Sequence, residues 1–165
     1  MKKEMKKELV QERKSITFLN AREAREIIQK IEEHFGASAY SLLESYSFVK
    51  TNKDKLHMIS RGVDGLEMDR VNSVGLYIAD LQGDSVRLSM EGAALIGSSA
   101  TKNVVELDAD ELKKWLRGED LQKKGEWDGF VLLKYKTDFV GSGKYSNGTI
   151  YNFVPKTRRV KELIV

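Results

Sequence analysis

One early segment of the chain has hydrophobic residues at intervals of three and four positions, the spacing that puts side chains on one face of an α-helix. The apolar positions are Ala24, Ile27, Ile28, Ile31 and Phe35. Asn20 precedes this stripe, and Glu23 lies three residues after Asn20. Such a pair can cap a helix reciprocally. Gly36 then supplies a residue suited to a helix end. The pattern predicts an amphipathic helix between Asn20 and Gly36.

A second amphipathic helix is predicted after Asp108. Asp108 and Glu111 repeat the capping pair, and Gly118 marks the end of the helix. Its inward-facing residues are Leu112, Trp115 and Leu116. Between the two helices, the small residues of 91–100 predict a short buried helix.

Most of the other segments are β-forming runs separated by Gly, Asn and Asp. They span residues 15–19, 46–51, 56–61, two runs within 74–90, and then 103–107, 130–135, 138–145 and 149–154. Polar residues 52–55 predict a hairpin loop, and Asn147-Gly148 is the strongest short hairpin signal in the chain. Gly141 and Gly143 interrupt a strand, which indicates strand curvature or a close backbone approach more than a phosphate-binding loop.

Together these elements predict an α+β fold in two parts. Residues 1–71 are expected to form a small N-terminal α+β domain. Residues 72–165 are expected to form a mostly β domain that closes as a small curved barrel with short helices on its flanks.

Positive charge is concentrated in one part of the chain. The whole sequence has 28 Lys and Arg residues against 25 Asp and Glu residues, a net charge of +3. Residues 129–161 hold seven of the basic residues and a single acid, so that this segment carries +6 and the remainder −3. Aromatic residues lie among them at Tyr135, Tyr145, Tyr151 and Phe153. Cations suit phosphates and flat rings suit bases, so the segment predicts a β-surface that binds a polyanion.

The end of this basic segment is its most distinctive part. Lys156, Arg158 and Arg159 follow Pro155, the one proline of the chain, at the exit of the last strand. No acid stands beside them in the sequence, which predicts a preorganised phosphate-binding tail. The alternative is that these cations only solubilise a chain end. The opening residues 1–14 mix Lys, Arg and Glu, and are expected to be a solvated helix or a basic arm.

Several classes of protein are excluded or disfavoured by composition. The chain has no Cys, and His34 and His57 are its two histidines, neither within a metal-ligand motif. Carboxylate pairs lie at predicted helix ends, where capping accounts for them. No nucleophile, metal or dinucleotide motif is present, so we expect no catalytic residues, no metal and no cofactor. No apolar run is long enough to span a bilayer and the start lacks a signal-peptide core, which predicts a cytoplasmic protein.

The basic segment also has a recognisable order of motifs. They are Gly-Phe-Val-Leu-Leu at 129–133, Phe-Val-Gly-Ser-Gly-Lys at 139–144, Asn-Gly at 147–148, and Asn-Phe-Val-Pro-Lys at 152–156 followed by Arg. Upstream, Val-Gly-Leu-Tyr-Ile at 74–78, Arg-Leu-Ser at 87–89 and Leu-Arg-Gly at 116–118 continue the series. Over about residues 72–161 this order resembles the C-terminal PUA-like domain of the Sun/Fmu family of RNA cytosine-5 methyltransferases.

The resemblance implies a PUA-like pseudobarrel that binds structured RNA, either rRNA or tRNA. Enzymes of this family need an S-adenosylmethionine domain and a catalytic Cys, and this sequence has neither, so we expect no methyltransferase activity. A PUA-type domain behind an α+β domain is also similar in layout to small archaeal and eukaryotic ribosome-biogenesis factors. We therefore predict a non-enzymatic RNA-binding protein of RNA modification or ribosome biogenesis, with an RNA methyltransferase or a ribosome-assembly factor as a further partner.

Nine residues are predicted to contact RNA: Lys134, Lys136, Lys144, Tyr145, Tyr151, Asn152, Lys156, Arg158 and Arg159. The cations would hold phosphates, the two tyrosines would stack, and Asn152 would bond a base edge or tie the tail. Two other interpretations stay open. One is a protein-interaction module that docks onto a methyltransferase or ribosomal protein through the N-terminal helix and hairpin. The other is an unrecognised hydrolase with a substrate-sized pocket.

Overall fold

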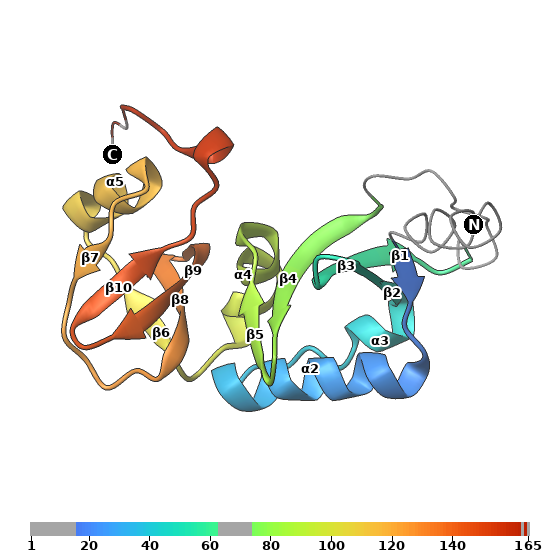
Figure 1. Ribbon diagram of the computed structural model, residues 1–165. Helices are drawn as coiled ribbons and strands as arrows, with labels where there is room; N and C mark the ends of the chain where they lie inside the picture. The colour runs from blue at the N-terminus through green and yellow to red at the C-terminus, as the bar shows by residue number, and fades with distance from the viewer. Residues whose placement is uncertain (1–15, 63–73, 163, 165) are drawn as a thin grey trace, which may run out of the picture.

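A computed structural model of the chain describes residues 16–62, 74–162 and 164, which form two five-stranded sheets with helices packed against them (Figure 1). The predicted segment 1–14 lies outside the described residues. The α+β class expected from the sequence is confirmed. None of the helices in the described ranges has the length and apolar composition needed to cross a lipid bilayer.

The first sheet is an antiparallel meander in sequence order. Its strands are β1 (Ile16–Phe18), β2 (Tyr46–Thr51), β3 (Lys55–Ser60), β4 (Leu76–Gln82) and β5 (Ser85–Leu88). The predicted hairpin over residues 46–61 is confirmed as β2 and β3, and Asp54 in its loop takes a left-handed conformation with φ of 56°. β4 and β5 form the next hairpin around Gly83.

The second sheet has the strand order β6-β8-β9-β10-β7 and curls into the predicted PUA-like pseudobarrel. Its strands are β6 (Val104–Glu106), β7 (Leu121–Gln122), β8 (Gly129–Tyr135), β9 (Asp138–Ser146) and β10 (Thr149–Asn152). β6 runs parallel to β8, and the other neighbours are antiparallel. Asn147 and Gly148, with φ of 49° and 82°, join β9 to β10, as the predicted turn requires.

Both capping pairs expected from the sequence form as predicted. In α2 (Ala21–Phe35), the Asn20 side chain accepts a hydrogen bond from the Glu23 N–H, and the Glu23 carboxylate accepts one from Asn20. In α5 (Ala109–Arg117), Asp108 and Glu111 do the same. The shorter helices are α3 (Leu42–Ser45), α4 (Met90–Ile96), and the 3-10 turns η1 (Gly97–Ser99) and η2 (Lys156–Arg158).

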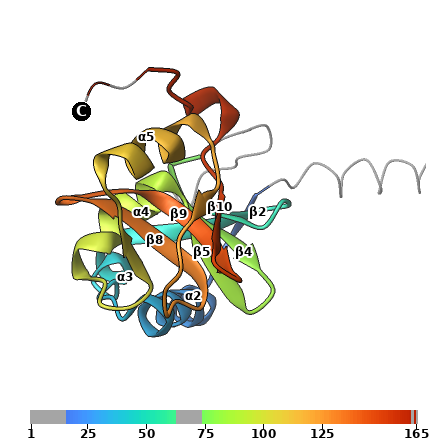
Figure 2. The same ribbon diagram turned by 90° about the vertical axis from the view of Figure 1, so that its left-hand side faces the viewer.

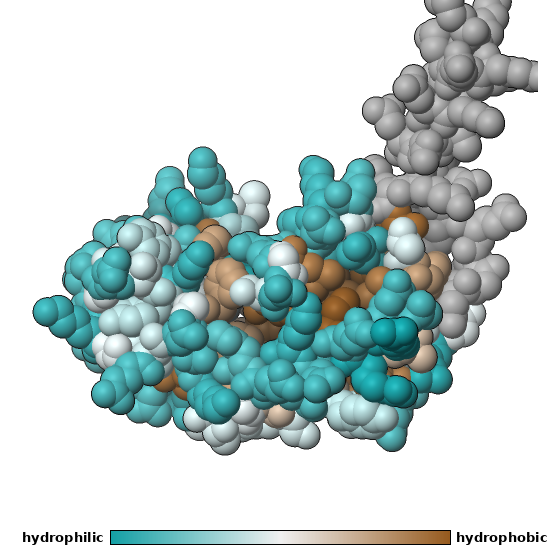
Figure 3. Space-filling view, turned by 60° about the horizontal axis from the view of Figure 1, so that its bottom comes forward, coloured by the Kyte–Doolittle hydropathy of each residue, from teal (hydrophilic) through white to brown (hydrophobic). Residues whose placement is uncertain are grey.

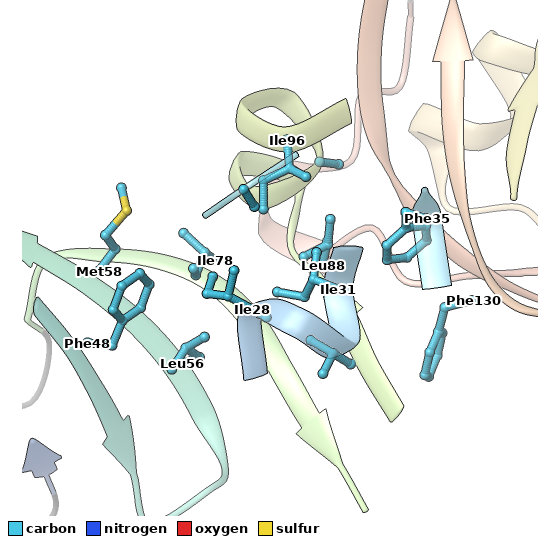
Figure 4. Packing of buried hydrophobic residues seen from close by; sticks show 14 of the residues in the cluster. Ile28, Ile31, Phe35, Phe48, Leu56, Met58, Ile78, Leu88, Ile96 and Phe130 are labelled. Atoms are coloured by element: carbon cyan, nitrogen blue, oxygen red, sulfur yellow. The ribbon is translucent and has the colours of Figure 1, made fainter. Parts of the chain in front are cut away.

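Strand β8 connects the two hydrophobic cores, because its alternate residues point to opposite sides of the sheet. Phe130 and Leu132 join a core with α2 and the first sheet, where Phe130 lies near Phe35 (Figure 4). Val131 and Leu133 join a second core on the α5 side. Figure 2 shows the same division, with α5 on one side of the second sheet and α2 on the other.

Polar contacts reinforce the joint between the two sheets. His34, at the end of α2, has its Nε2 2.8 Å from the carbonyl oxygen of Phe130 in β8. Asn103, which precedes β6, donates from Nδ2 to the His34 carbonyl at 2.9 Å. The two halves are thus packed into one body with a shared strand.

The domain boundary predicted between residues 71 and 72 lies outside the described residues. The first sheet continues on its C-terminal side, because β4 pairs with β3. The change from one sheet to the other falls later, after α4 and η1. A division by sheet would therefore assign residues 76–88 to the first half.

Candidate nucleic-acid interface

Two of the three predicted cations of the β8–β9 hairpin, Lys134 and Lys136, lie at its turn end. Lys134 is half-buried, with its Nζ 3.7 Å from a carboxylate oxygen of Glu106 and 5.8 Å from the centre of the Phe139 ring. Lys136 is exposed at the turn, over the ring of Tyr135 at 5.1 Å. In the register of the hairpin, Tyr135 pairs with Asp138 while Phe130 pairs with Lys144. Lys134 and Lys136 therefore lie at the end of the hairpin opposite to Lys144.

Lys144 and Tyr151 are brought together by the sheet. They are direct partners in the register of β9 and β10, and both side chains are exposed, Tyr151 to 46%. The Lys144 Nζ lies 5.9 Å from the ring centre of Phe130, whose side chain belongs to the core of the first sheet. Lys144 and Tyr151 thus occupy the sheet face that is turned toward the first half of the molecule.

Tyr145 and Asn152 belong to the opposite face, where both have structural partners. The Tyr145 hydroxyl accepts a hydrogen bond from the Gly125 N–H at 3.3 Å, and its ring contacts that of Trp127 edge-on at 5.4 Å. The Asn152 side-chain amide donates to the carbonyls of Trp115 and Glu119, at 2.8 and 2.9 Å. Of the two roles expected for Asn152, the structure shows the one that ties the tail to the end of α5.

The three tail cations point to different surroundings. Arg158 forms an ion pair with Glu91 at the start of α4, 67 residues away in sequence. Arg159 donates from Nε to the Val154 carbonyl at 3.2 Å and lies against Gly118, where a Cβ atom would be 2.2 Å from that Nε. Lys156 is exposed on η2. The expectation that no acid lies near the tail fails at Arg158, because the fold supplies Glu91 from a distant segment.

Arg158 and Glu91 stand at the rim of a groove between the first sheet and the C-terminal tail. The groove has a volume of about 420 Å³, and its lining includes Tyr77, Arg87, Glu91, Ser142, Phe153 and Arg158. We call it the junction groove, because these residues come from β4, β5, α4, β9 and the tail. Figure 3 shows one face of the molecule, on which hydrophobic side chains gather in a hollow with hydrophilic ones around them.

Arg87 is the principal cation inside the junction groove. Its side chain is only 13% exposed, and it forms an ion pair with Asp80, the residue directly opposite it on β4. Its guanidinium lies over the Phe153 ring at 4.5 Å. Burial lowers the pKa of Arg87 from its usual value, yet an arginine side chain stays protonated at neutral pH. Its Nε has no hydrogen-bond partner among the described residues, so one donor of this group is unused.

A series of neighbouring cations and aromatic rings runs from the first sheet across the groove to the second sheet. The Lys55 Nζ lies 4.7 Å from the Tyr77 ring centre, and the Tyr77 hydroxyl lies 3.5 Å from Arg87. The Phe153 ring that Arg87 covers is 6.3 Å from that of Phe130, which in turn lies under Lys144. We call this series the cationic-aromatic strip: Lys55, Tyr77, Arg87, Phe153, Phe130 and Lys144.

A second pocket borders the strip at its first-sheet end. Its volume is about 550 Å³, and its lining includes Thr51, Asn52, Lys53, Lys55, His57 and Tyr77. It therefore shares the side chains of Lys55 and Tyr77 with the junction groove. His57 is buried beside the Tyr77 ring, and burial lowers the pKa of its imidazole.

Sequence reasoning missed Lys55, Tyr77 and Arg87, because they lie outside the basic segment 129–161. Their proximity to Phe153 depends on how the two sheets pack, and no local pattern carries that information. In the described residues, no three His, Asp or Glu side chains gather in a way that would hold a metal ion.

Comparison with known proteins agrees with this architecture. Residues 102–160 match the model of the PUA domain of methyltransferase RsmF. A ribosomal RNA small subunit methyltransferase F of Aeromonas salmonicida is 28% identical over 141 residues, covering 84% of this chain and 28% of that protein. Its counterpart in Vibrio cholerae is 28% identical over 88 residues, covering 53% of this chain and 19% of the relative.

The matched part of the chain thus covers between 19% and 28% of the length of these relatives. The Aeromonas match is too long to fit within the PUA segment alone, so the similarity extends into the first half of the chain. The resemblance expected from the sequence is confirmed: the C-terminal part of this chain is similar to the PUA domain of an RNA methyltransferase of the RsmF type.

Proposed function

We propose that this protein binds structured RNA, with rRNA as the first candidate and tRNA as the second, and that it acts in RNA modification or ribosome biogenesis. The observation that carries the proposal is the cationic-aromatic strip on a domain similar to the PUA domain of RsmF. The names of the relatives specify small-subunit rRNA as their substrate, which makes that RNA the first to test.

Accessible side chains on and beside the strip suit the two parts of an RNA contact, phosphate and base. Lys55 and Lys144 present ammonium groups at the two ends of the strip, where phosphates can approach. Tyr151 and Phe153, exposed to 46% and 38%, offer ring surface for bases or riboses. Lys136 and Lys156 are exposed at the edges and would add phosphate contacts.

Binding, rather than catalysis, is the role we assign to the residues described. The family model that this chain matches is that of the PUA domain, and the lining of the junction groove includes the ion-paired Arg87 and Arg158 and the ring of Phe153. In this proposal the protein works in the cytoplasm alongside a methyltransferase or a ribosome-assembly factor that acts on the same RNA.

Titration of a labelled small-subunit rRNA fragment and of a tRNA at several salt concentrations tests the proposal. Affinity should fall steeply with salt, because released counterions drive phosphate binding. Replacing Lys55 and Lys144 together by Gln should weaken binding and make the slope of log affinity against log salt shallower by about 1.4 to 1.8 units, for two lost phosphate contacts. A double variant with Lys113→Gln and Lys114→Gln on α5, which covers the other face of the second sheet, is the charge-matched control.

The result decides between RNA binding and protein docking. Unchanged affinity and slope in the Lys55/Lys144 variant would remove the strip from the RNA interface. Failure to bind any RNA, together with association to a methyltransferase or ribosomal protein that survives high salt, would establish the docking interpretation instead.

A further inference from the structure

We propose that the junction groove and the second pocket together receive two consecutive unpaired nucleotides of the RNA, with the phosphate between them on Lys55. This inference rests on the proposed function and names the part of the RNA that the site selects. It predicts a preference for RNA with a single-stranded extension or bulge over a fully paired helix.

The shared wall of the two pockets is the first argument. Lys55 and Tyr77 line both the junction groove, of about 420 Å³, and the second pocket, of about 550 Å³. Both volumes lie in the range of pockets that hold small organic ligands. Two neighbouring pockets divided by one ammonium group and one ring match the repeat of a nucleic-acid strand, in which bases alternate with phosphates.

The distribution of charge places the phosphate at Lys55. In the junction groove, Arg87 is paired with Asp80 and Arg158 with Glu91, so both guanidinium groups already have carboxylate partners. Lys55 has no ion pair among the described residues, and its Nζ lies over the Tyr77 ring. Lys55 is therefore the cation of the groove that can neutralise a phosphate without breaking an existing ion pair.

The chemistry of the groove favours an unpaired base. Phe153 has one face covered by Arg87 and is still 38% exposed, so an incoming base can extend the stack. The hydroxyls of Ser89 and Ser142 are used inside the protein, on the carbonyls of Tyr77 and Leu88. The polar groups left for a base edge are the unused Nε donor of Arg87 and the Arg158–Glu91 pair, a donor and an acceptor that would exchange their mutual contact for the base. A paired base presents neither a free face nor that edge.

A set of hairpin RNAs tests this inference with the full chain. One hairpin is blunt, and the others carry a single-stranded extension of one, two or four nucleotides. Affinity should rise with the first two nucleotides and change little with the next two. Phe153→Ala should lower affinity for the extended hairpins by about 5- to 150-fold, the range for loss of one stacked base, and leave the blunt hairpin almost unaffected.

A fluorescent variant makes the test independent of the stability of Phe153→Ala. Phe153→Trp keeps an aromatic ring in the groove, so it should retain the preference for extended hairpins, and its emission should be quenched by them. Tyr40→Trp is the control, because Tyr40 is 51% exposed and does not line either pocket. The native Trp115 and Trp127 belong to the α5-side core and give the background.

The possible outcomes separate this inference from the proposed function. Equal, salt-dependent affinity for blunt and extended hairpins would overturn the nucleotide pockets while leaving RNA binding intact. Preference for the extension without quenching at position 153 would also overturn it, because the base would then lie elsewhere. Absence of binding to every RNA would refute both proposals.

Discussion

Ile31 offers a test of whether the two halves of the molecule unfold as one body. Its side chain is fully buried in the core formed by α2, the first sheet and two residues of β8. Both tryptophans, Trp115 and Trp127, belong to or pack on the other core. A substitution at Ile31 therefore acts in one core, while tryptophan fluorescence reports on the other.

Replacing Ile31 by Ala removes buried methyl groups and should lower the free energy of unfolding by about 2–5 kcal/mol. With an m-value of about 2 kcal/mol per molar urea, the midpoint should fall by about 1–2.5 M. Because β8 contributes Phe130 and Leu132 to the first core, and Val131 and Leu133 to the second, the loss should reach both halves.

Urea titrations followed in parallel by far-UV circular dichroism and by tryptophan fluorescence measure this coupling. We expect the two midpoints to coincide in the natural protein and to shift together in Ile31→Ala. A fluorescence midpoint that stays in place while the dichroism midpoint falls would show two independent domains, and the shared-strand account of the fold would be wrong.

Two further changes probe the second core and the second pocket. Gly143→Ala should lower the free energy of unfolding by about 1–3 kcal/mol in a urea titration. The new Cβ atom would lie 2.7 Å from the Tyr151 carbonyl oxygen and 2.8 Å from the Trp115 ring. An unchanged midpoint would contradict that packing. Burial lowers the pKa of His57 in the folded state below the ordinary value near 6.5. The contribution of the neutral His57 to stability is therefore present above pH 6.5 and is lost as the pH falls toward the folded-state pKa. His57→Gln should therefore show a smaller fall in unfolding free energy between pH 7.5 and 5.5 than the natural protein, and parallel curves would refute this.

Local structure was predictable wherever a short segment determines it. The two capping pairs and the hairpins depend on residues within four positions of one another, and they form as predicted, except that Lys55, expected in the first hairpin loop, is the first residue of β3. The expected close approach at Gly143 is also confirmed, because the Tyr151 carbonyl and the Trp115 ring occupy the space of a Cβ atom.

The arrangement of the site was less predictable, because it depends on which face of each strand is turned outward. Tyr145 and Tyr151 looked equivalent in the sequence, yet the register of β9 and β10 puts Tyr145 beside Trp127 and leaves Tyr151 beside Lys144. Arg158 and Glu91 are 67 residues apart, so their pairing requires the packing of α4 against the tail. The proposed interface also depends on the packing of distant segments, and it therefore includes residues outside the basic segment 129–161.

The cationic-aromatic strip crosses a joint that is already packed, and this affects the energetics of RNA binding. Phe130 is at once a member of the strip and a buried residue of the first core. Arg87 is held by Asp80 and Phe153, so its orientation is fixed before RNA arrives. A surface built in this way loses little conformational entropy on binding, because neither the sheets nor these side chains need to be ordered. Removing Asp80 would release Arg87 without changing any cation, and for this reason we expect the positions of the charges in the strip, as much as their number, to determine RNA affinity.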